Sequence, residues 1–216
     1  MLRSRSAPSV RPAKPAAQTP YLDLDPLAAE AVYEALAFTG QDFTGQAAAM
    51  VSFARCSLLK VNLAHTRLSR LGLREVRLDG CDLANAVWER ACLENTHLEG
   101  CRMVGLELTG ALIRHSVFQA CNGSFAHFRG VTFKHSRFLD CNLRGSSFQE
   151  ADLRGAVFQG SDLGEAQLSF ARLEGADFRG AELQGIRVRI EDLKGAIVDP
   201  AQAAYLSGLM GLKVMA

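Results

Sequence analysis

The sequence predicts an all-β solenoid in which each coil has four flat sides, followed by one short C-terminal helix. Three observations predict it: a large apolar residue at every fifth position, a small residue two places before it, and similar residues at every twentieth position. A five-residue period fits neither the helical period of about 3.6 residues nor the two-residue alternation of a strand. It therefore indicates a chain that turns a corner after each short extended segment.

The large apolar residue recurs without interruption from Tyr33 to Val198. Of these 34 positions, 32 hold large apolar side chains and 26 hold Leu or Phe, while Ala48 and Gly123 depart from the pattern. Stacked layers of such residues would fill the axis of a solenoid. We expect an irregular coil around Gly123, with Phe125 partly filling the gap, and a bend at the unit around Ala48.

The remaining positions of the unit describe a strand and a corner. The residue two places before the large one is Ala, Ser, Cys, Thr or Val in 27 of 34 cases, and the last residue of the unit is Gly in 14 cases. Two inward side chains separated by an outward one are typical of a strand. Gly permits a backbone turn that other residues resist, so each unit predicts one side of a coil.

The recurrence at twenty residues indicates four sides in each coil. Cysteines and Asx residues repeat at this interval, as expected if like residues stack in ladders on successive coils. The repeating residues are Cys81, Cys101, Cys121 and Cys141, and Asp42, Asn62, Asp82, Asn122, Asn142 and Asp162.

Several units resemble those of a known family. ADLRG (151–155), SDLGE (161–165), CNLRG (141–145) and ADFRG (176–180) are similar to the units of the pentapeptide-repeat proteins, roughly Ala-(Asp/Asn)-Leu-x-x. The resemblance covers residues 31–198. It implies a right-handed quadrilateral β-helix of about eight coils, which would be about 40 Å long at the usual strand spacing.

The N-terminal part of the chain has a different composition. Residues 1–20 carry four basic residues and no acid, and they have almost no large apolar side chains. We expect a disordered basic tail, because such a segment cannot bury enough surface to offset the entropy of ordering. Residues 21–30 are expected to cap the solenoid. A capping helix begun by Asp25 and Pro26 and a first coil that includes Tyr33 both fit the sequence here.

Residues 199–216 are expected to form a C-terminal helical cap and dimerisation module. Asp199 is a good N-cap, Pro200 suits the first turn, and Gly211 suits the end of a helix. A cap alone is the simpler alternative, but the segment has more apolar residues than a cap needs. The expected dimer interface comprises Leu206, Leu209, Met210, Leu212 and Val214.

The C-terminal segment LKGAIVDPAQAAYLSGLMGLKVMA (193–216) resembles the C-terminal module of the Qnr quinolone-resistance proteins and their mycobacterial relative. Gly195, Asp199 and Gln202 carry this match. The resemblance implies a homodimer joined through the C-terminal helix. It also implies a DNA-like rod that binds DNA gyrase and topoisomerase IV, although this chain is nearly neutral where such rods are acidic.

No motif indicates catalysis, a cofactor or a metal. The sequence has no glycine-rich phosphate loop after a strand and no nucleophile–base motif. The laddered cysteines occupy the small inward position, which favours packing, and His115 and His135 lack a third metal ligand. No run approaches the about 20 apolar residues of a membrane span. We therefore expect a non-enzymatic cytoplasmic protein without membrane contact.

One side of the solenoid is expected to bind the partner. It has a net charge of −3, with Asp42, Asp82, Asp162, Glu165 and Glu182 opposed by Arg102 and Arg144. Carboxylates in a regular array can imitate phosphates, so we expect this side to contact the type II topoisomerase that the resemblance implies. An interaction scaffold for another cytoplasmic protein is the alternative. Direct nucleic-acid binding through the Arg-rich side and the basic tail is not expected, because aromatic residues are not interleaved there.

Overall fold

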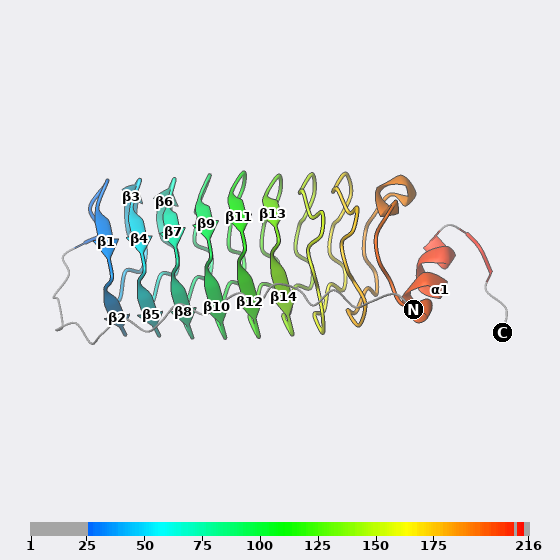
Figure 1. Cartoon of the computed structure of the whole chain (residues 1–216), viewed down its shortest axis with the longest axis horizontal. Coiled ribbons are helices and arrows are strands. Elements are labelled where there is room, and N and C mark those ends of the chain that lie inside the picture. Colours follow the sequence, from blue (N-terminus) through cyan, green and yellow to red (C-terminus); the bar gives the residue numbers. More distant parts are fainter. Residues whose placement is uncertain (1–25, 210, 214–216) are drawn as a thin grey trace, which may run out of the picture.

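The computed structural model describes residues 26–209 and 211–213, which form a right-handed quadrilateral β-helix with one α-helix at its C-terminal end (Figure 1). This confirms the fold class expected from the five-residue period. The expected tail at 1–20 and the first part of the expected cap, residues 21–25, lie outside the described residues.

Each strand is three residues long and is centred on the large apolar residue of one unit. The first sheet contains β1 (Val32–Glu34), β4 (Ser52–Ala54), β7 (Gly72–Arg74), β9 (Cys92–Glu94), β11 (Leu112–Arg114) and β13 (Thr132–Lys134). The second contains β2 (Ala37–Thr39), β5 (Ser57–Leu59), β8 (Arg77–Asp79), β10 (His97–Glu99), β12 (Val117–Gln119) and β14 (Arg137–Leu139). A third pairs β3 (Ala47–Ala49) with β6 (Arg67–Ser69).

All of these strands pair in parallel with an offset of twenty residues, as Tyr33 does with Phe53. Each six-stranded sheet spans six consecutive coils, fewer than the eight coils expected from the sequence. Isolated parallel bridges continue the same register beyond the strands, as far as Asp177 and Ile197. After β14 the coils therefore pair through single bridges rather than through strands.

The corners adopt a left-handed backbone whether or not they hold glycine. Between residues 26 and 209, nineteen non-glycine residues have φ between 49° and 65°, among them Arg70 and His135. This conformation costs roughly 1–2 kcal/mol per residue for an L-amino acid. The corner amide offsets part of that cost by donating to the next coil, as Arg70 N does to Glu89 O at 2.9 Å. Glycine therefore accounts for only part of the corners.

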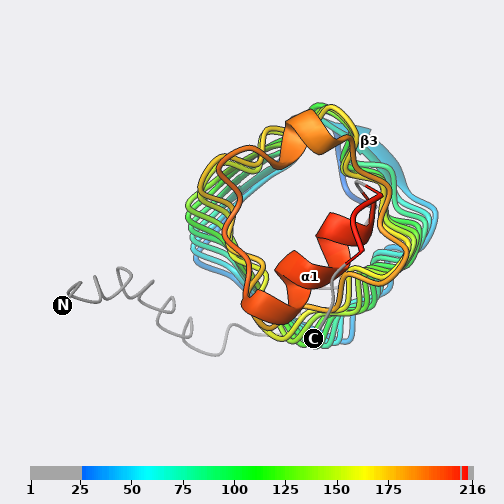
Figure 2. The ribbon, with the colours of Figure 1, turned by 90° about the vertical axis from the view of Figure 1, so that its right-hand side faces the viewer.

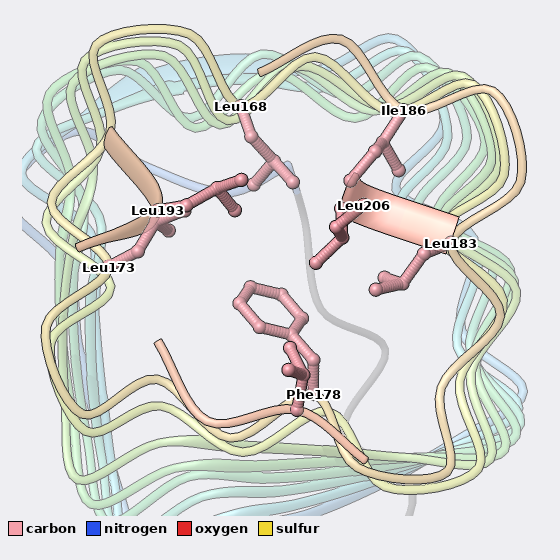
Figure 3. A pocket seen from close by; sticks show the side chains of 8 residues that line it. Leu168, Leu173, Phe178, Leu183, Ile186, Leu193 and Leu206 are labelled. Carbon is pink, nitrogen blue, oxygen red and sulfur yellow. The ribbon is translucent and has the colours of Figure 1, made fainter. Parts of the chain in front are cut away.

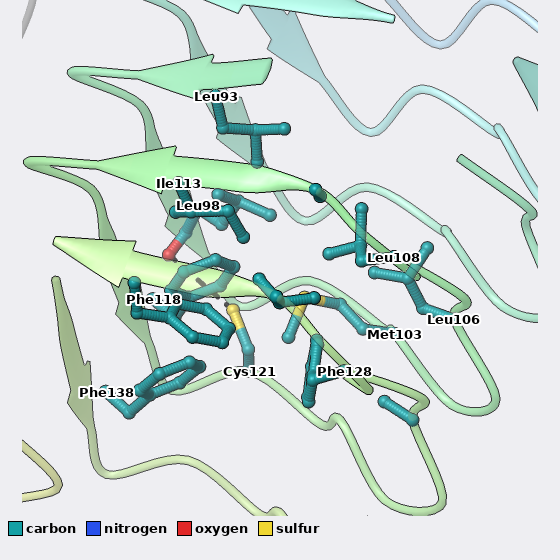
Figure 4. Close-up of a cluster of buried hydrophobic side chains, with 14 of the residues drawn as sticks. Leu93, Leu98, Met103, Leu106, Leu108, Ile113, Phe118, Cys121, Phe128 and Phe138 are labelled. Atoms are coloured by element: carbon teal, nitrogen blue, oxygen red, sulfur yellow. Dashed lines mark hydrogen bonds between the residues drawn. The ribbon is translucent and has the colours of Figure 1, made fainter. Parts of the chain in front are cut away.

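The interior is a continuous column of apolar side chains, part of which is drawn in Figure 4. The rings of Phe118, Phe138, Phe158 and Phe178 stack on successive coils, with centroids 4.7, 5.1 and 5.0 Å apart. Small residues such as Cys121 lie beside them and are also buried. This arrangement fills the axis in layers, as the sequence pattern predicted.

The two units that lack a large central residue, around Ala48 and Gly123, do not disturb the rod. The predicted irregular coil at Gly123 is wrong: its amide donates to Asn142 O at 2.7 Å, in the regular register. Leu143 and Met103 occupy the space beside it, while Phe125 points outward and is 63% exposed. The predicted bend at Ala48 is also wrong, because Ala48 lies in β3 and pairs with Leu68.

The N-terminal end is a first coil rather than a capping helix. Residues 26–31 form a bend and a turn, and β1 begins at Val32. Leu27 is buried against the core, and its amide donates to Gln46 Oε1 at 2.8 Å. This side chain closes the core at that end within the described residues.

The C-terminal end carries a 3-10 helix, η1 (Ile190–Leu193), and the helix α1 (Pro200–Leu209), which lies across the open end of the last coil (Figure 2). Side chains replace the missing next coil as acceptors for its amides. Phe170 N donates to Asp192 at 2.7 Å, and Gly185 N donates to the Tyr205 hydroxyl at 2.7 Å. The last coil therefore presents fewer unpaired edge groups for aggregation.

Candidate protein-binding surface

The predicted acidic side is a single ladder in the structure. Parallel bridges link its members in the order Asp42, Asn62, Asp82, Arg102, Asn122, Asn142, Asp162 and Glu182. Four of the five predicted acids therefore lie in one row along the rod, and Glu165 lies at the adjoining corner. We call this row the Asx ladder.

The side chains of the Asx ladder have a structural task that sequence reasoning missed. Asp42, Asp82 and Asp162 each accept a hydrogen bond from the amide two residues later, at 2.8–2.9 Å. Glu182 does the same with Gln184 N at 3.0 Å. This bond mimics a backbone turn and stabilises the corner that follows. The recurrence of Asp and Asn alike was a signal for this bond, because the uncharged Asn62 makes it as well.

Ion pairs divide the predicted acids into two groups. Arg102 pairs with Asp82 at 3.0 Å, and Arg144 contacts both Asp162 at 3.5 Å and Glu165 at 2.6 Å. Among the described residues, Asp42 and Glu182 are in no ion pair. The hydroxyl and then the amide of Thr44 hold the pKa of Asp42 below its usual value. Negative charge is therefore confined to parts of the Asx ladder, and the row is not uniformly acidic.

The C-terminal end of the ladder forms one wall of a cleft. Asp162 and Glu182 line it together with Asp199 and Tyr205 from the cap. Three carboxylates and a phenol therefore line the same cleft, where the last coils adjoin α1. A partner's Lys or Arg side chain would find several acceptors here.

A reciprocal capping box fixes the helix beside this cleft. Asp199 Oδ1 accepts from Gln202 N at 2.9 Å, and Gln202 Oε1 accepts from Asp199 N at 2.9 Å. Gln202 Nε2 also donates to the carbonyls of Phe178 and Ala181 at 2.6 and 2.7 Å. The sequence Asp-Pro-Ala-Gln predicted the N-cap but not the second task of Gln202, which joins the helix to the last coil.

The expected dimer residues separate into different environments. Leu206 is buried at 7% exposure and packs against the core of its own rod, close to Leu183 and Ile186 (Figure 3). Leu209 and Leu212 are 45% and 59% exposed. Met210 and Val214 lie outside the described residues. Leu206 therefore serves as a cap residue within the chain, and its assignment to a dimer interface is wrong because its side chain is already covered.

The laddered cysteines are buried packing residues. The Cys101 thiol donates to the carbonyls of Leu78 and Glu99, as the Thr96 hydroxyl does to the equivalent carbonyls on the neighbouring side. Contact with the Cys121 thiol, together with burial, raises the pKa of Cys101. Cysteine thus substitutes for Ser or Thr here, and Cys92 is the exposed thiol among the six.

The described residues contain no group of three or more side chains suited to hold a metal ion. In the same part of the chain, no helix has the length and apolar character needed to cross a membrane.

The comparisons with known proteins concern the repeat. Two family models match, described as a pentapeptide repeat region (residues 72–140 and 91–168) and as pentapeptide repeats (residues 161–185). No curated protein matches the chain.

Similar solved structures include three pentapeptide-repeat proteins. Trypsin-treated QnrB1, a plasmid-mediated fluoroquinolone resistance protein, is 23% identical over 85% of this chain and 100% of its own, with a TM-score of 0.40. HetL from the cyanobacterium Nostoc, involved in heterocyst differentiation regulation, is 21% identical over 78% and 87%, with a TM-score of 0.32. A thylakoid-lumen protein of Arabidopsis thaliana is 26% identical over 49% and 74%, with a TM-score of 0.45. From the repeat, its register and the matching family models, the chain belongs to the pentapeptide-repeat family.

Proposed function

We propose that this protein is a non-catalytic binding rod of the cytoplasm that engages a type II topoisomerase, DNA gyrase first, and protects it from inhibitors such as quinolones. The observation that carries the proposal is the C-terminal cleft, where Asp162, Glu182 and Asp199 meet. Gly195, Asp199 and Gln202 also match the Qnr module in sequence, and the last two form the capping box that seats the helix.

The contact would use local carboxylates rather than an evenly charged rod. Asp162 and Glu182 lie next to each other in the Asx ladder, and Asp199 faces them from the cap. A topoisomerase surface that receives DNA phosphates has Lys and Arg side chains, and these would bind the carboxylates in the same way. The near-neutral net charge of +1 predicts weaker long-range steering than an acidic rod would have.

The test is a gyrase supercoiling assay with and without a quinolone. We expect the purified protein to relieve quinolone inhibition or, at higher concentration, to inhibit supercoiling itself. A protein that does neither would overturn the topoisomerase assignment.

Charge can be removed from the ladder without removing its turns. Asn62 accepts the same amide bond that the aspartates accept, so Asp162→Asn combined with Glu182→Gln should preserve the fold. We expect this variant to need at least about fivefold more protein for the same effect, in line with the loss of two charge-assisted contacts. Glu75→Gln with Glu94→Gln, on the opposite side of the rod, is the matched control and should leave the effect unchanged.

We also propose that two copies associate through the C-terminal end. Leu209, the last residue of α1, and Leu212 after it expose apolar surface there, while Leu206 of the same helix covers the core. Light scattering of the intact protein should give a dimer, and Leu209→Asp should give a monomer with unchanged circular dichroism. A monomeric wild-type protein would contradict this.

A further inference from the structure

One stretch of the rod carries cations without acids. Residues 109–139, more than one full coil, contain three arginines, one lysine and three histidines but no Asp or Glu. Most of these side chains gather where the side formed by β11 and β13 meets the side formed by β12 and β14. We call this group the cationic corner; it comprises Arg114, His115, Lys134, His135 and Arg137.

The cations of this corner lack acidic partners. Within the described residues, Arg114, Lys134 and Arg137 take part in no ion pair, whereas Arg77, Arg102 and Arg144 elsewhere on the rod do. The Nε atoms of Arg114 and Arg137 are also buried without a hydrogen-bond acceptor. Buried donors are normally paired, so these guanidinium groups retain unused donors.

The same corner presents a stack of aromatic rings. The imidazoles of His115 and His135 lie 5.0 Å apart between centroids, with 10° between their planes, and both side chains are exposed. The next corner in this column is Gly155, which has no side chain, and no atom lies within 4 Å of the place where a Cβ would stand. Gly175 follows it in the column. No corner side chain therefore covers the His135 ring on the side of Gly155.

We propose that the cationic corner binds single-stranded nucleic acid, with a base stacked on the open face of His135 and adjacent phosphates against Arg114, Lys134 and Arg137. Guanidinium and ammonium groups are the usual partners of phosphates. A ring with an open face is a stacking platform for an unpaired base, which a duplex does not offer.

The cationic corner is not part of the Arg-rich side, for which the sequence predicted no nucleic-acid binding. Arg70 and Arg90 share that region with Glu89, and within the described residues no stacked pair of rings lies at these two corners. The cationic corner instead combines cations and rings in one place. Its footprint is short, because Glu94 bounds it on one side and the Arg154–Asp152 ion pair bounds it on the other.

The test is fluorescence anisotropy with a labelled oligo(dT) of about twelve nucleotides at low salt, a length within the range that one binding module occupies. We expect saturable binding that weakens with salt. Arg114→Gln with Lys134→Gln should weaken binding and lower the magnitude of the salt slope by about 1.4, since each lost phosphate contact contributes about 0.7 for single strands. Arg67→Gln with Arg70→Gln removes the same charge from another side and should change neither.

The stacking step has its own test. Gly155→Asn places a side chain over the ring while keeping a residue that tolerates this backbone, since Asn95 has φ of 52° at an equivalent corner. We expect this variant and His135→Ala to weaken oligo(dT) binding at least about fivefold and to leave binding of inorganic polyphosphate unchanged. No binding by the wild-type protein, equal loss in the Arg67/Arg70 control, or equal binding of polyphosphate and oligo(dT) would overturn the proposal.

Discussion

Replacing Leu206 by Ala distinguishes a cap residue from an interface residue. Leu206 is 7% exposed and contacts the apolar end of the core near Leu183 and Ile186 (Figure 3). Buried Leu→Ala changes cost about 2–5 kcal/mol, and the value depends on how far the site collapses. The last coil has a neighbouring coil on one side only and can relax, so we expect a cost of about 2–3 kcal/mol.

The assay is equilibrium unfolding in urea, followed by circular dichroism at low protein concentration. Leu209→Ala is the matched control, because Leu209 lies in the same helix but is 45% exposed. It should change the free energy of unfolding by no more than about 0.5 kcal/mol. If Leu206→Ala costs no more than Leu209→Ala, the assignment of Leu206 to the core is refuted.

Three further predictions concern the core, the thiols and the cap. Phe138→Ala should cost about 3–5 kcal/mol in urea unfolding because it opens a cavity inside a ring stack, whereas Phe125→Ala, at an exposed corner, should cost no more than about 0.5 kcal/mol; equal costs would contradict the layered core. A thiol reagent should modify one cysteine rapidly in the native protein, Cys92, and all six after unfolding; rapid reaction of more than one would show that the rod opens. The Gln202 and Gly180 amides lower the pKa of Asp199 in the folded protein. The stability that this carboxylate adds is therefore fully present above the unfolded pKa of about 3.9 and is lost as the pH falls through the lower folded pKa. Asp199→Asn should remove this acid-dependent step from a pH series of thermal unfolding, and an unchanged profile would contradict the prediction.

Most of the fold could be predicted because each five-residue unit repeats the same pattern of inward and outward residues. The large residue at every fifth position and the small residue before it define two inward positions, and the twenty-residue recurrence defines the side on which each unit lies. These patterns are local and redundant, so Ala48 and Gly123 do not disturb the rod. The wrong predictions at both positions assumed that a missing side chain leaves a gap, but neighbours from adjacent coils fill it, as Leu143 and Met103 do at Gly123.

The candidate surfaces could be predicted only in part because they depend on side-chain partners in other coils. The sequence placed Asp82 and Asp162 on one side, but it did not show that Arg102 and Arg144 would form ion pairs with them. Apolar character alone also did not separate Leu206 from Leu209. That distinction depends on which side of α1 faces the core, which the tertiary structure determines.

The twenty-residue register has a consequence for how such a chain can change in length. Deleting four consecutive units would remove a whole coil and leave every later residue on its own side. Deleting a single unit, such as 151–155, would keep the interior in register, because every unit buries the same two positions. It would also rotate all that follows by one side, so that Asp162 would leave the row of Asp82 and join that of Arg137. An insertion or deletion of one unit can therefore rearrange the outward residues of the rod without changing the apolar interior that stabilises it.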